Sequence, residues 1–348
     1  MEHASRATTM RDVAERAGVS TATVSRVISG TTRVRPATRA GVMAAVEALR
    51  YRPSGVARSL KLRSTRTIGL VVTDIANPYF PKIVRAVEDA ALERGHAVLL
   101  CDGADDPSRE ETYLDLLIER RVDGIVIASS GLEARYRDWL ARRSVPVVLV
   151  NCTARGASLS AILSDNRAGG RLAAEHVLAL GHRAIGHISA PSRNAAAGER
   201  LAGIGDAISE VKGADLVVVD GDGGVDGAEE ATSALLDRLP GVTAILCYND
   251  LTAIGVVRAL RERGLRVPAD VSVVGYDDVP FSAWLDPALT TVAQDTSEMG
   301  RWAVERLVGL IGRAPGSSAD AEAEAEVVLL PVSLRVREST APPAAARA

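Results

Sequence analysis

From residue 66 to about residue 338, short apolar runs alternate with longer stretches in which apolar positions recur at helical spacing. Apolar runs of this length are typical of strands buried on both faces, and the stretches between them are typical of amphipathic helices. Strands that alternate with helices predict βαβ units and parallel sheets. We expect eight strands, four before and four after about Asp165, and therefore two similar lobes. The expected strands are 67–72, 97–100, 124–128, 145–150, 184–188, 216–219, 244–246 and 271–274, and the helices between them are about 79–94, 107–120, 167–180, 199–211, 226–239 and 250–263.

The first fifty residues show a different pattern, which predicts three short helices. Thr9 and Asp12 have the spacing of a capping box, and Gly18 can end the first helix because glycine adopts positive φ readily. Ser20 is well placed to cap a second helix, and Pro36 occupies the favoured first position of a third, which should run to about residue 49. Two short helices joined by a tight glycine turn indicate a helix-turn-helix. The inward-facing positions are Val13, Ala14, Ala17, Val24, Val27, Ile28, Val42, Val46 and Leu49.

Charge separates the same two regions. The first 66 residues carry 13 Arg or Lys and four Asp or Glu, whereas the other 282 residues carry 28 basic and 40 acidic side chains. A small basic module joined to a large acidic body is typical of a polyanion-binding head on a sensing or catalytic body. Contact with phosphate should therefore be confined to the head.

Other classes of protein fit the sequence less well. No run approaches 18 apolar residues, the start of the chain lacks a signal peptide, and three widely spaced cysteines fit reduced thiols, so we expect a cytoplasmic protein without a membrane partner. The main alternative to a sensing body on a polyanion-binding head is an α/β enzyme with a DNA-binding head. The sequence contains no phosphate-binding loop, dinucleotide fingerprint, HExxH or nucleophile elbow, so we expect neither an enzyme nor a cofactor. A periplasmic binding protein is disfavoured by the basic head.

Aromatic and polar side chains gather where the predicted strands end. In α/β sheets, ligands bind beyond the carboxyl ends of the strands, and rings combined with carboxylates and amides suit a sugar or a similarly hydroxylated ligand. Tyr276 and Asn249 could instead only brace loops. The residues at these ends are Asp74, Asn77, Tyr79, Phe80, Asp165, Tyr248, Asn249, Tyr276, Asp277, Phe281 and Trp284.

Specific motifs in the head and in the segment after it resemble those of a known family. Residues 12–20 (DVAERAGVS) and 23–27 (TVSRV), followed by residues 51–54 (YRPS) and 56–60 (VARSL), resemble the lac repressor/galactose repressor family of bacterial regulators. The resemblance extends to about residue 338. It implies a small all-α helix-turn-helix head plus an α/β body of two lobes with parallel sheets, similar to periplasmic sugar-binding proteins. It also implies a transcriptional regulator, most often a repressor of a sugar or related catabolic operon, that binds double-stranded operator DNA as a homodimer and responds to a small-molecule effector.

The resemblance also assigns roles to residues. In the family the second helix enters the major groove, which makes Thr21, Ala22 and Arg26 base-reading positions, although Thr21 and Ala22 could merely fill space. Arginine pairs bidentately with guanine, and the methyl groups of threonine and alanine suit thymine. Ser20, Thr23, Ser25, Ser29 and Arg33 are expected phosphate contacts, and Ala57, Arg58, Leu60 and Lys61 are expected minor-groove hinge contacts. Phe80, Arg200 and Asp277 occupy the family's effector-contacting positions, and Arg193 could pair with an acidic ligand. Together with residues at the strand ends, the expected effector-binding positions are Asp74, Asn77, Tyr79, Phe80, Asp165, Arg193, Arg200, Asn249, Asp277 and Trp284.

The expected domains are a head at residues 9–53, a hinge helix and linker at 54–65, and a body at 66–338. The N-lobe should comprise about 66–164 and 296–327, and the C-lobe about 165–295 and 328–338. The hinge helix is too short to be stable alone and should fold only against DNA and a partner hinge. The resemblance implies that Leu60 is wedged into a base step of the DNA. A tail at 339–348 should be disordered, and its lack of heptads argues against a tail-mediated tetramer.

Overall fold

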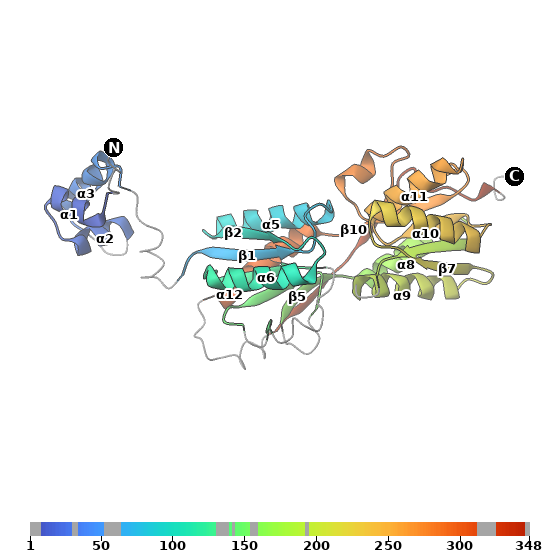
Figure 1. Cartoon of the computed structure of the whole chain (residues 1–348), viewed down its shortest axis with the longest axis horizontal. Helices are drawn as coiled ribbons and strands as arrows, with labels where there is room; N and C mark the ends of the chain where they lie inside the picture. Colours follow the sequence, from blue (N-terminus) through green and yellow to red (C-terminus); the bar gives the residue numbers. More distant parts are fainter. Residues whose placement is uncertain are drawn as a thin grey trace. The chain divides into compact units, whose positions relative to one another are not determined.

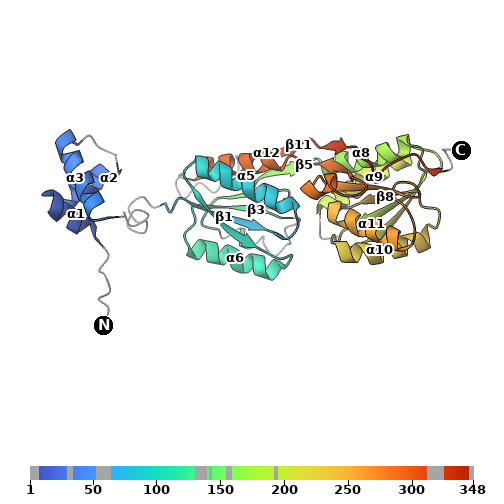
Figure 2. The same cartoon turned by 90° about the horizontal axis from the view of Figure 1, so that it is seen from above.

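The computed structural model separates into two compact units, residues 1–65 and 66–348 (Figures 1 and 2). Among the described residues, no helix is both long enough and apolar enough to span a membrane. The cysteines are free thiols. The structure describes residues 8–29, 34–51, 64–129, 139–140, 143–153, 159–191, 195–311 and 325–344.

The first unit contains the three predicted helices, α1 (Met10–Ala17), α2 (Thr21–Ser29) and α3 (Pro36–Ala48). The capping box is formed, because the Thr9 N–H donates to the Asp12 carboxylate at 2.7 Å and the Asp12 N–H donates to Thr9 Oγ1 at 3.4 Å. Gly18 ends α1 in the left-handed region at φ 64°. The helix-turn-helix prediction is therefore confirmed. The core of this unit consists of Val13, Ala14, Val24, Val27, Val42, Ala45 and Tyr51, with Val46 and Leu49 partly buried against it.

The N-lobe of the second unit is built on a parallel sheet with the strand order β11-β5-β4-β3-β1-β2. Figure 2 shows α5 and α12 on one face of this sheet and α6 on the other. Two hydrophobic cores lie on the two faces, which explains why its central strands are apolar throughout. The elements are β1 (Thr67–Val72), α5 (Tyr79–Glu93), β2 (Ala97–Asp102), α6 (Pro107–Glu119), β3 (Gly124–Ala128), β4 (Val147–Val150), β5 (Ser160–Ser164), α12 (Thr296–Leu310) and β11 (Val327–Leu330).

The C-lobe repeats this plan with the strand order β12-β10-β9-β8-β6-β7, and only the pairing of β12 with β10 is antiparallel. Helices α8 and α9 cover one face, and α10 and α11 cover the other (Figure 2). The elements are α8 (Asn166–Ala179), β6 (Ala184–Ser189), α9 (Ala195–Ser209), β7 (Asp215–Asp220), α10 (Val225–Arg238), β8 (Ala244–Cys247), α11 (Asp250–Glu262), β9 (Ser272–Asp277), the 3-10 helix η1 (Pro280–Ala283), β10 (Thr290–Ala293) and β12 (Ser333–Arg335).

All eight expected strands are present, but β5, β10, β11, β12 and helix α12 were missed. The four missed strands have three to five residues each, and β5, β10 and β12 carry Ser or Thr at positions that an apolar run would fill. All four flank the points where the chain passes between the lobes, outside the regular alternation of strand and helix. The final crossing follows Leu330, because β11 lies in the N-lobe sheet, and the predicted division between residues 327 and 328 was therefore wrong.

The prediction of a disordered tail from residue 339 was also wrong for residues 339–344. Ser339 is fully buried, and its Oγ donates to the Val273 carbonyl at 2.6 Å and accepts from the Thr290 N–H at 2.8 Å. The Ala341 carbonyl lies 2.9 Å from His182 Nε2 and accepts a hydrogen bond from the Ser272 hydroxyl. The Ala- and Pro-rich composition suggested disorder, whereas backbone hydrogen bonding fixes this segment on the C-lobe.

Close packing of α8 against α9 depends on glycine at the contact. A Cβ on Gly203 would lie 1.9 Å from the Arg167 carbonyl oxygen, and one on Gly170 would lie 2.0 Å from the Arg200 carbonyl oxygen. Both obstacles are backbone atoms, which a rotamer change cannot move. The two helices therefore approach each other as closely as their backbones allow, and this contact fixes the position of Arg200 on α9.

We predict opposite effects for alanine at two glycines of α9. Gly203→Ala should lower the free energy of unfolding by about 1–3 kcal/mol, the usual cost of overpacking. Gly205→Ala should raise it by roughly 0.5–1 kcal/mol, because no atom lies within 4 Å of its added Cβ and alanine favours helix. Denaturant titration followed by circular dichroism measures both. Equal stability of the two variants would show that the helices are not in backbone contact.

Candidate functional site

Helix α2 presents one exposed face that contains all three predicted base-reading residues. Val24 and Val27 point into the core with at most 2% exposure, whereas Thr21, Ala22 and Arg26 are exposed within an arc of roughly 140° at 100° per residue. The turn before the helix is fixed, because the Thr23 N–H donates to Ser20 Oγ at 3.2 Å. The buried positions thus dictate which residues of α2 an approaching molecule can touch.

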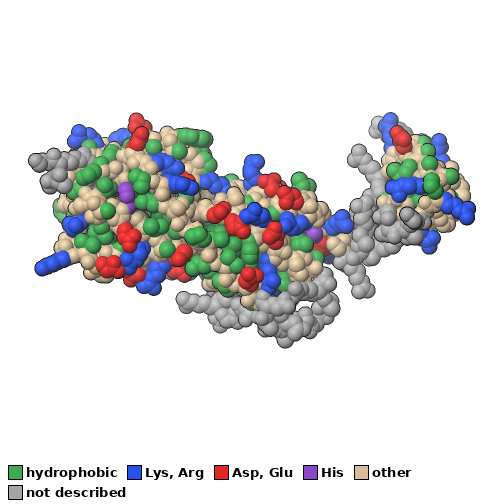
Figure 3. Space-filling view, turned by 180° about the vertical axis from the view of Figure 1, so that it is seen from behind, with side chains coloured by type: hydrophobic (Ala, Val, Ile, Leu, Met, Phe, Trp, Pro, Cys, Tyr) green, Lys and Arg blue, Asp and Glu red, His purple; other side chains and the backbone are tan. Residues whose placement is uncertain are grey.

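The described part of the first unit is basic at its surface. Asp12 is engaged in the capping box, and Glu15 pairs with Arg11 at 3.2 Å. Figure 3 shows Lys and Arg side chains spread over this unit with few acidic ones. Each described basic residue is exposed, namely Arg11, Arg16, Arg26, Arg35, Arg39 and Arg50.

Several predicted contact residues cannot be compared with the structure. Arg33, Arg193 and the hinge positions Ala57, Arg58, Leu60 and Lys61 lie outside the described residues, as does the side chain of Ser29. Ser25 is half-buried on α2.

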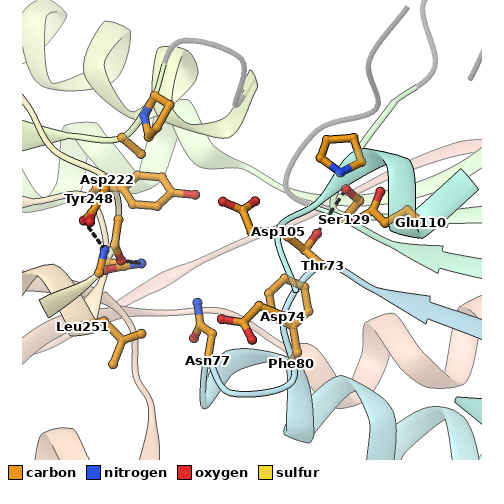
Figure 4. A pocket seen from close by; sticks show the side chains of 16 residues that line it. Thr73, Asp74, Asn77, Phe80, Asp105, Glu110, Ser129, Asp222, Tyr248 and Leu251 are labelled. Atoms are coloured by element: carbon orange, nitrogen blue, oxygen red, sulfur yellow. Dashed lines mark hydrogen bonds between the residues drawn. The ribbon is translucent and has the colours of Figure 1, made fainter. Parts of the chain in front are cut away.

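A cavity of about 300 Å³ lies in the second unit, lined by both lobes (Figure 4). Its walls are loops and helix starts that follow β1, β2 and β3 on one side and β6, β7 and β8 on the other. The carboxyl ends of the two parallel sheets therefore form it, as expected for ligand sites in α/β folds. The lining residues are Thr73, Asp74, Asn77, Phe80, Asp105, Pro107, Glu110, Ser129, Ala190, Pro191, Asp222, Gly223, Gly224, Tyr248, Asn249 and Leu251.

Four of the predicted effector-binding residues line this cavity, namely Asp74, Asn77, Phe80 and Asn249. Asn249 is also structural, because its Oδ1 accepts from the Thr252 N–H at 2.7 Å and caps α11, and its Nδ2 donates to the Gly223 carbonyl at 2.9 Å. It thereby ties the loop after β7 to the loop after β8. The two interpretations of Asn249, a brace for loops and a cavity residue, are compatible.

Arg200 and Asp277 lie behind the cavity wall and are not among its lining residues. The Arg200 guanidinium donates to the Tyr248 carbonyl at 2.6 Å and to Asn166 Oδ1 at 2.9 Å, and it lies 3.6 Å from the centre of the Tyr276 ring. Its Nη2 is 3.8 Å from Asp277 Oδ1. Burial raises the pKa of the Asp277 carboxyl to about 7, against the opposing effect of Arg200. This buried cluster supports the Tyr248 segment from inside the C-lobe.

Gln294 connects this cluster to the N-lobe. It lies between β10 and α12, where the chain crosses, and its Nε2 donates to Asp277 Oδ1 at 2.6 Å. Its Oε1 accepts from Ser164 Oγ at 2.6 Å and from the Tyr79 hydroxyl at 3.4 Å. Tyr79 therefore acts in this network rather than in the cavity, and its ring packs edge-on against Phe80 with 5.2 Å between centres. One buried amide thus joins two crossing segments to the N-lobe.

The remaining predicted effector-binding residues that the structure describes, Asp165 and Trp284, do not line the cavity. Asp165 caps α8, accepting from the Ala168 N–H at 2.9 Å, because it directly follows the end of β5. Trp284 is 75% exposed and packs against Phe281 away from the cavity lining. A position just after a strand is thus not sufficient to identify a residue that lines the cavity, since helix caps and exposed surface residues occupy the same positions.

Sequence reasoning did not select several lining residues, above all Asp105, Glu110, Ser129 and Asp222. The first three follow the expected strands at 97–100 and 124–128, so the strand-end rule already contained the signal. Asp250, between two lining residues, points away from the cavity. Its carboxylate accepts from Ser282, Thr291 and the Val279 N–H at 2.6–2.9 Å, and burial raises the pKa of this carboxyl to about 6.

Comparison with known proteins places both units in one family. Residues 9–54 match the model for bacterial regulatory proteins of the lacI family, and residues 65–338 match that for periplasmic binding proteins and the sugar-binding domain of the LacI family. The chain is 37% identical to the HTH-type transcriptional repressor PurR of Photobacterium profundum over 303 residues, which cover 86% of this chain and 91% of the relative.

Two solved structures are similar over most of their length. The lac repressor dimer bound to operator and the anti-inducer ONPF has a TM-score of 0.84 at 32% identity, covering 97% of this chain and all of that one. A LacI family regulator from Enterococcus faecium with bound ribose has a TM-score of 0.69 at 31% identity, covering 79% of this chain and 99% of that one. From its helix-turn-helix to the end of its two-lobed body, the chain belongs to the LacI family of bacterial transcriptional regulators.

Proposed function

We propose that the protein is a transcriptional repressor that binds a palindromic operator as a homodimer and releases or tightens its hold when a small molecule enters the cavity. The observation that carries this proposal is the presence, in one chain, of an exposed α2 face and a ligand-sized cavity at the strand ends of two lobes. The first binds DNA and the second senses the effector. No step of this function requires chemistry on the ligand.

We expect α2 and the residues around it to contact DNA. An exposed Arg26 has the reach for bidentate hydrogen bonds to guanine, and Thr21 and Ala22 offer methyl groups to thymine. Contacts to phosphate fix the position of the helix without reading sequence. We assign these contacts to Ser20, Thr23, Ser25, Ser29 and Arg33, and minor-groove contact at the hinge to Ala57, Arg58, Leu60 and Lys61.

A homodimer follows from the size of the head and from its similarity to the lac repressor dimer on operator. One short reading helix contacts too few bases for a specific site, and two related by a twofold axis read a palindrome. The second unit also exposes large apolar side chains of the kind that subunit interfaces bury. Leu92, at the end of α5, is 75% exposed, and Leu99 and Leu100, on edge strand β2, are 42% and 44% exposed.

The effector is a small hydroxylated molecule of the sugar class. The cavity offers two aromatic rings, Phe80 and Tyr248, among carboxylates, amides and hydroxyls, which is the lining that a hydroxylated ligand requires. The related regulator with bound ribose supports this class. A ligand that touches both walls prefers one arrangement of the lobes, and it shifts DNA affinity by as much as that preference.

For the reading helix, we predict that Arg26→Ala weakens operator binding by about 1–3 kcal/mol and relaxes base choice at one position in each half-site. Selection of binding sites from random DNA, followed by anisotropy titration, measures both effects. Arg39→Ala, which removes an exposed charge from α3, is the matched control and should leave base preference unchanged. Unaltered base preference in Arg26→Ala would mean that another element reads the operator.

For the cavity, we predict that Tyr248→Phe leaves operator affinity unchanged and weakens effector binding roughly fivefold, the effect of losing one hydrogen bond of about 1 kcal/mol. The ring, which lies 4.8 Å from the Arg200 guanidinium, is retained, so the wall keeps its support. Calorimetry with the effector measures the change. The control is Tyr113→Phe on α6, whose hydroxyl contacts Arg109 outside the cavity. Equal effector affinity in both variants would place the ligand elsewhere.

A further inference from the structure

One short segment of the C-lobe reaches into the N-lobe. Asp277 ends β9, and the next two residues, Asp278 and Val279, lead into η1. The Val279 side chain is 2% exposed and belongs to the hydrophobic core that β1, α5, β3, β4, β5 and α12 of the N-lobe build. Phe80, which lines the cavity, lies in the same core. Residues 277–279, the interlobe segment, therefore join the two lobes through a core that also holds part of the cavity wall.

The backbone of the interlobe segment is strained. Asp277 has a φ of 110° and Asp278 a φ of 49°, values that are uncommon for residues other than glycine. Such conformations persist only where surrounding contacts hold them, and they gather at ligand sites and switch regions. Asp250 Oδ2 accepts from the Val279 N–H at 2.9 Å, and the Arg337 guanidinium donates to the Asp278 carboxylate at 2.6 Å. The C-lobe thus holds the segment from one side.

The N-lobe holds the segment from the other side through Lys82. This half-buried residue lies in the first turn of α5, two positions after Phe80, and its ammonium donates a hydrogen bond to the Asp278 carbonyl. Hydrogen bonds from charged donors are stronger than those between neutral groups. Arg337 fixes the side chain of Asp278 within the C-lobe, because its guanidinium also donates to the Leu289 carbonyl at 2.8 Å. One strained residue is therefore fastened to both lobes at once.

We propose that Lys82 is a positioning residue of the effector response, which fastens the N-lobe to the interlobe segment and so stabilises the lobe arrangement of this structure over others. A strained segment between packed cores switches between discrete arrangements rather than deforming gradually. A ligand that moves Phe80 moves the first turn of α5, and with it the Lys82 ammonium. This proposal rests on the proposed function, because the lobe arrangement matters only if it changes the affinity for DNA.

The test compares Lys82→Met with Lys212→Met in the full-length protein. Methionine keeps an unbranched apolar chain but cannot donate to the carbonyl, and Lys212 is an exposed residue that follows α9. Single-molecule energy transfer between dyes that replace Glu119 on α6 and Asp237 on α10, both exposed, reports the separation of the lobes within one protomer. Lys82→Met should add a second population of separations, and Lys212→Met should not. Lys82→Arg, which restores a charged donor, should return most molecules to the wild-type population.

A second variant releases the same segment without altering Lys82. Val279→Ala withdraws two methyl groups from the N-lobe core and leaves the hydrogen bonds of the segment in place. If the interlobe segment is the element that switches, this variant should populate the same second separation as Lys82→Met. A folded Val279→Ala protein with only the wild-type separation would contradict the proposal.

Operator affinity provides the functional half of the test. It is measured by anisotropy, without any small molecule, on DNA that the wild-type protein selects from random sequences. Lys82→Met should change this affinity by roughly threefold or more, the effect of one hydrogen bond on a two-state balance, whereas Lys212→Met should not. An unchanged distribution of lobe separations overturns the proposal, and so does an altered distribution with unchanged operator affinity. If the wild-type protein selects no DNA, the proposed function fails together with this role of Lys82, which distinguishes that failure from one confined to the variant.

Discussion

Helices cover both faces of each parallel sheet, and this constraint determines where the protein can bind a ligand. The strands β1, β3, β6 and β8 are buried along their length, so polar side chains can meet a ligand only beyond the strand ends. Because the two sheets direct their carboxyl ends at one another, those residues meet in a single cavity. The chain crosses between the sheets beside it, and Gln294 joins two crossing segments to Tyr79. Ligand contact and lobe geometry therefore share one small region.

The buried pair of Arg200 and Asp277 supports the cavity wall from inside the C-lobe. Burial of an unpaired charge is costly, and the guanidinium avoids that cost through two close hydrogen-bond acceptors and the Tyr276 ring, with Asp277 at 3.8 Å. Asp277 in turn accepts from Gln294. A contact with Tyr248 in the cavity is thus connected, through groups with fixed partners, to the segments that set the lobe arrangement. Such a connection is what an effector needs to act on a separate DNA-binding unit.

Much of this architecture could be predicted from the sequence. Apolar runs and helical periodicity identified the first four strands of each lobe, and Thr9, Gly18 and Pro36 located the helices of the head. The short strands at the crossings were not predicted, because Ser and Thr interrupt the apolar runs of β5 and β10. These segments are strands because they pair with neighbouring strands in the folded sheet. The strand-end rule found Asp74, Asn77, Phe80 and Asn249 but could not separate lining residues from caps such as Asp165 or from the buried Asp277. That distinction depends on the direction of side chains, which spacing does not encode.

The central claim is that the cavity and the DNA-reading helix are thermodynamically coupled. The most direct test measures the affinity of the full-length protein for its effector with and without saturating operator, and its affinity for operator with and without saturating effector. Linkage requires the two ratios to be equal, and the coupling between the lobes predicts a ratio that differs from one by about 5- to 150-fold. A ratio of one in both titrations, for an effector shown to occupy the cavity, would contradict the account.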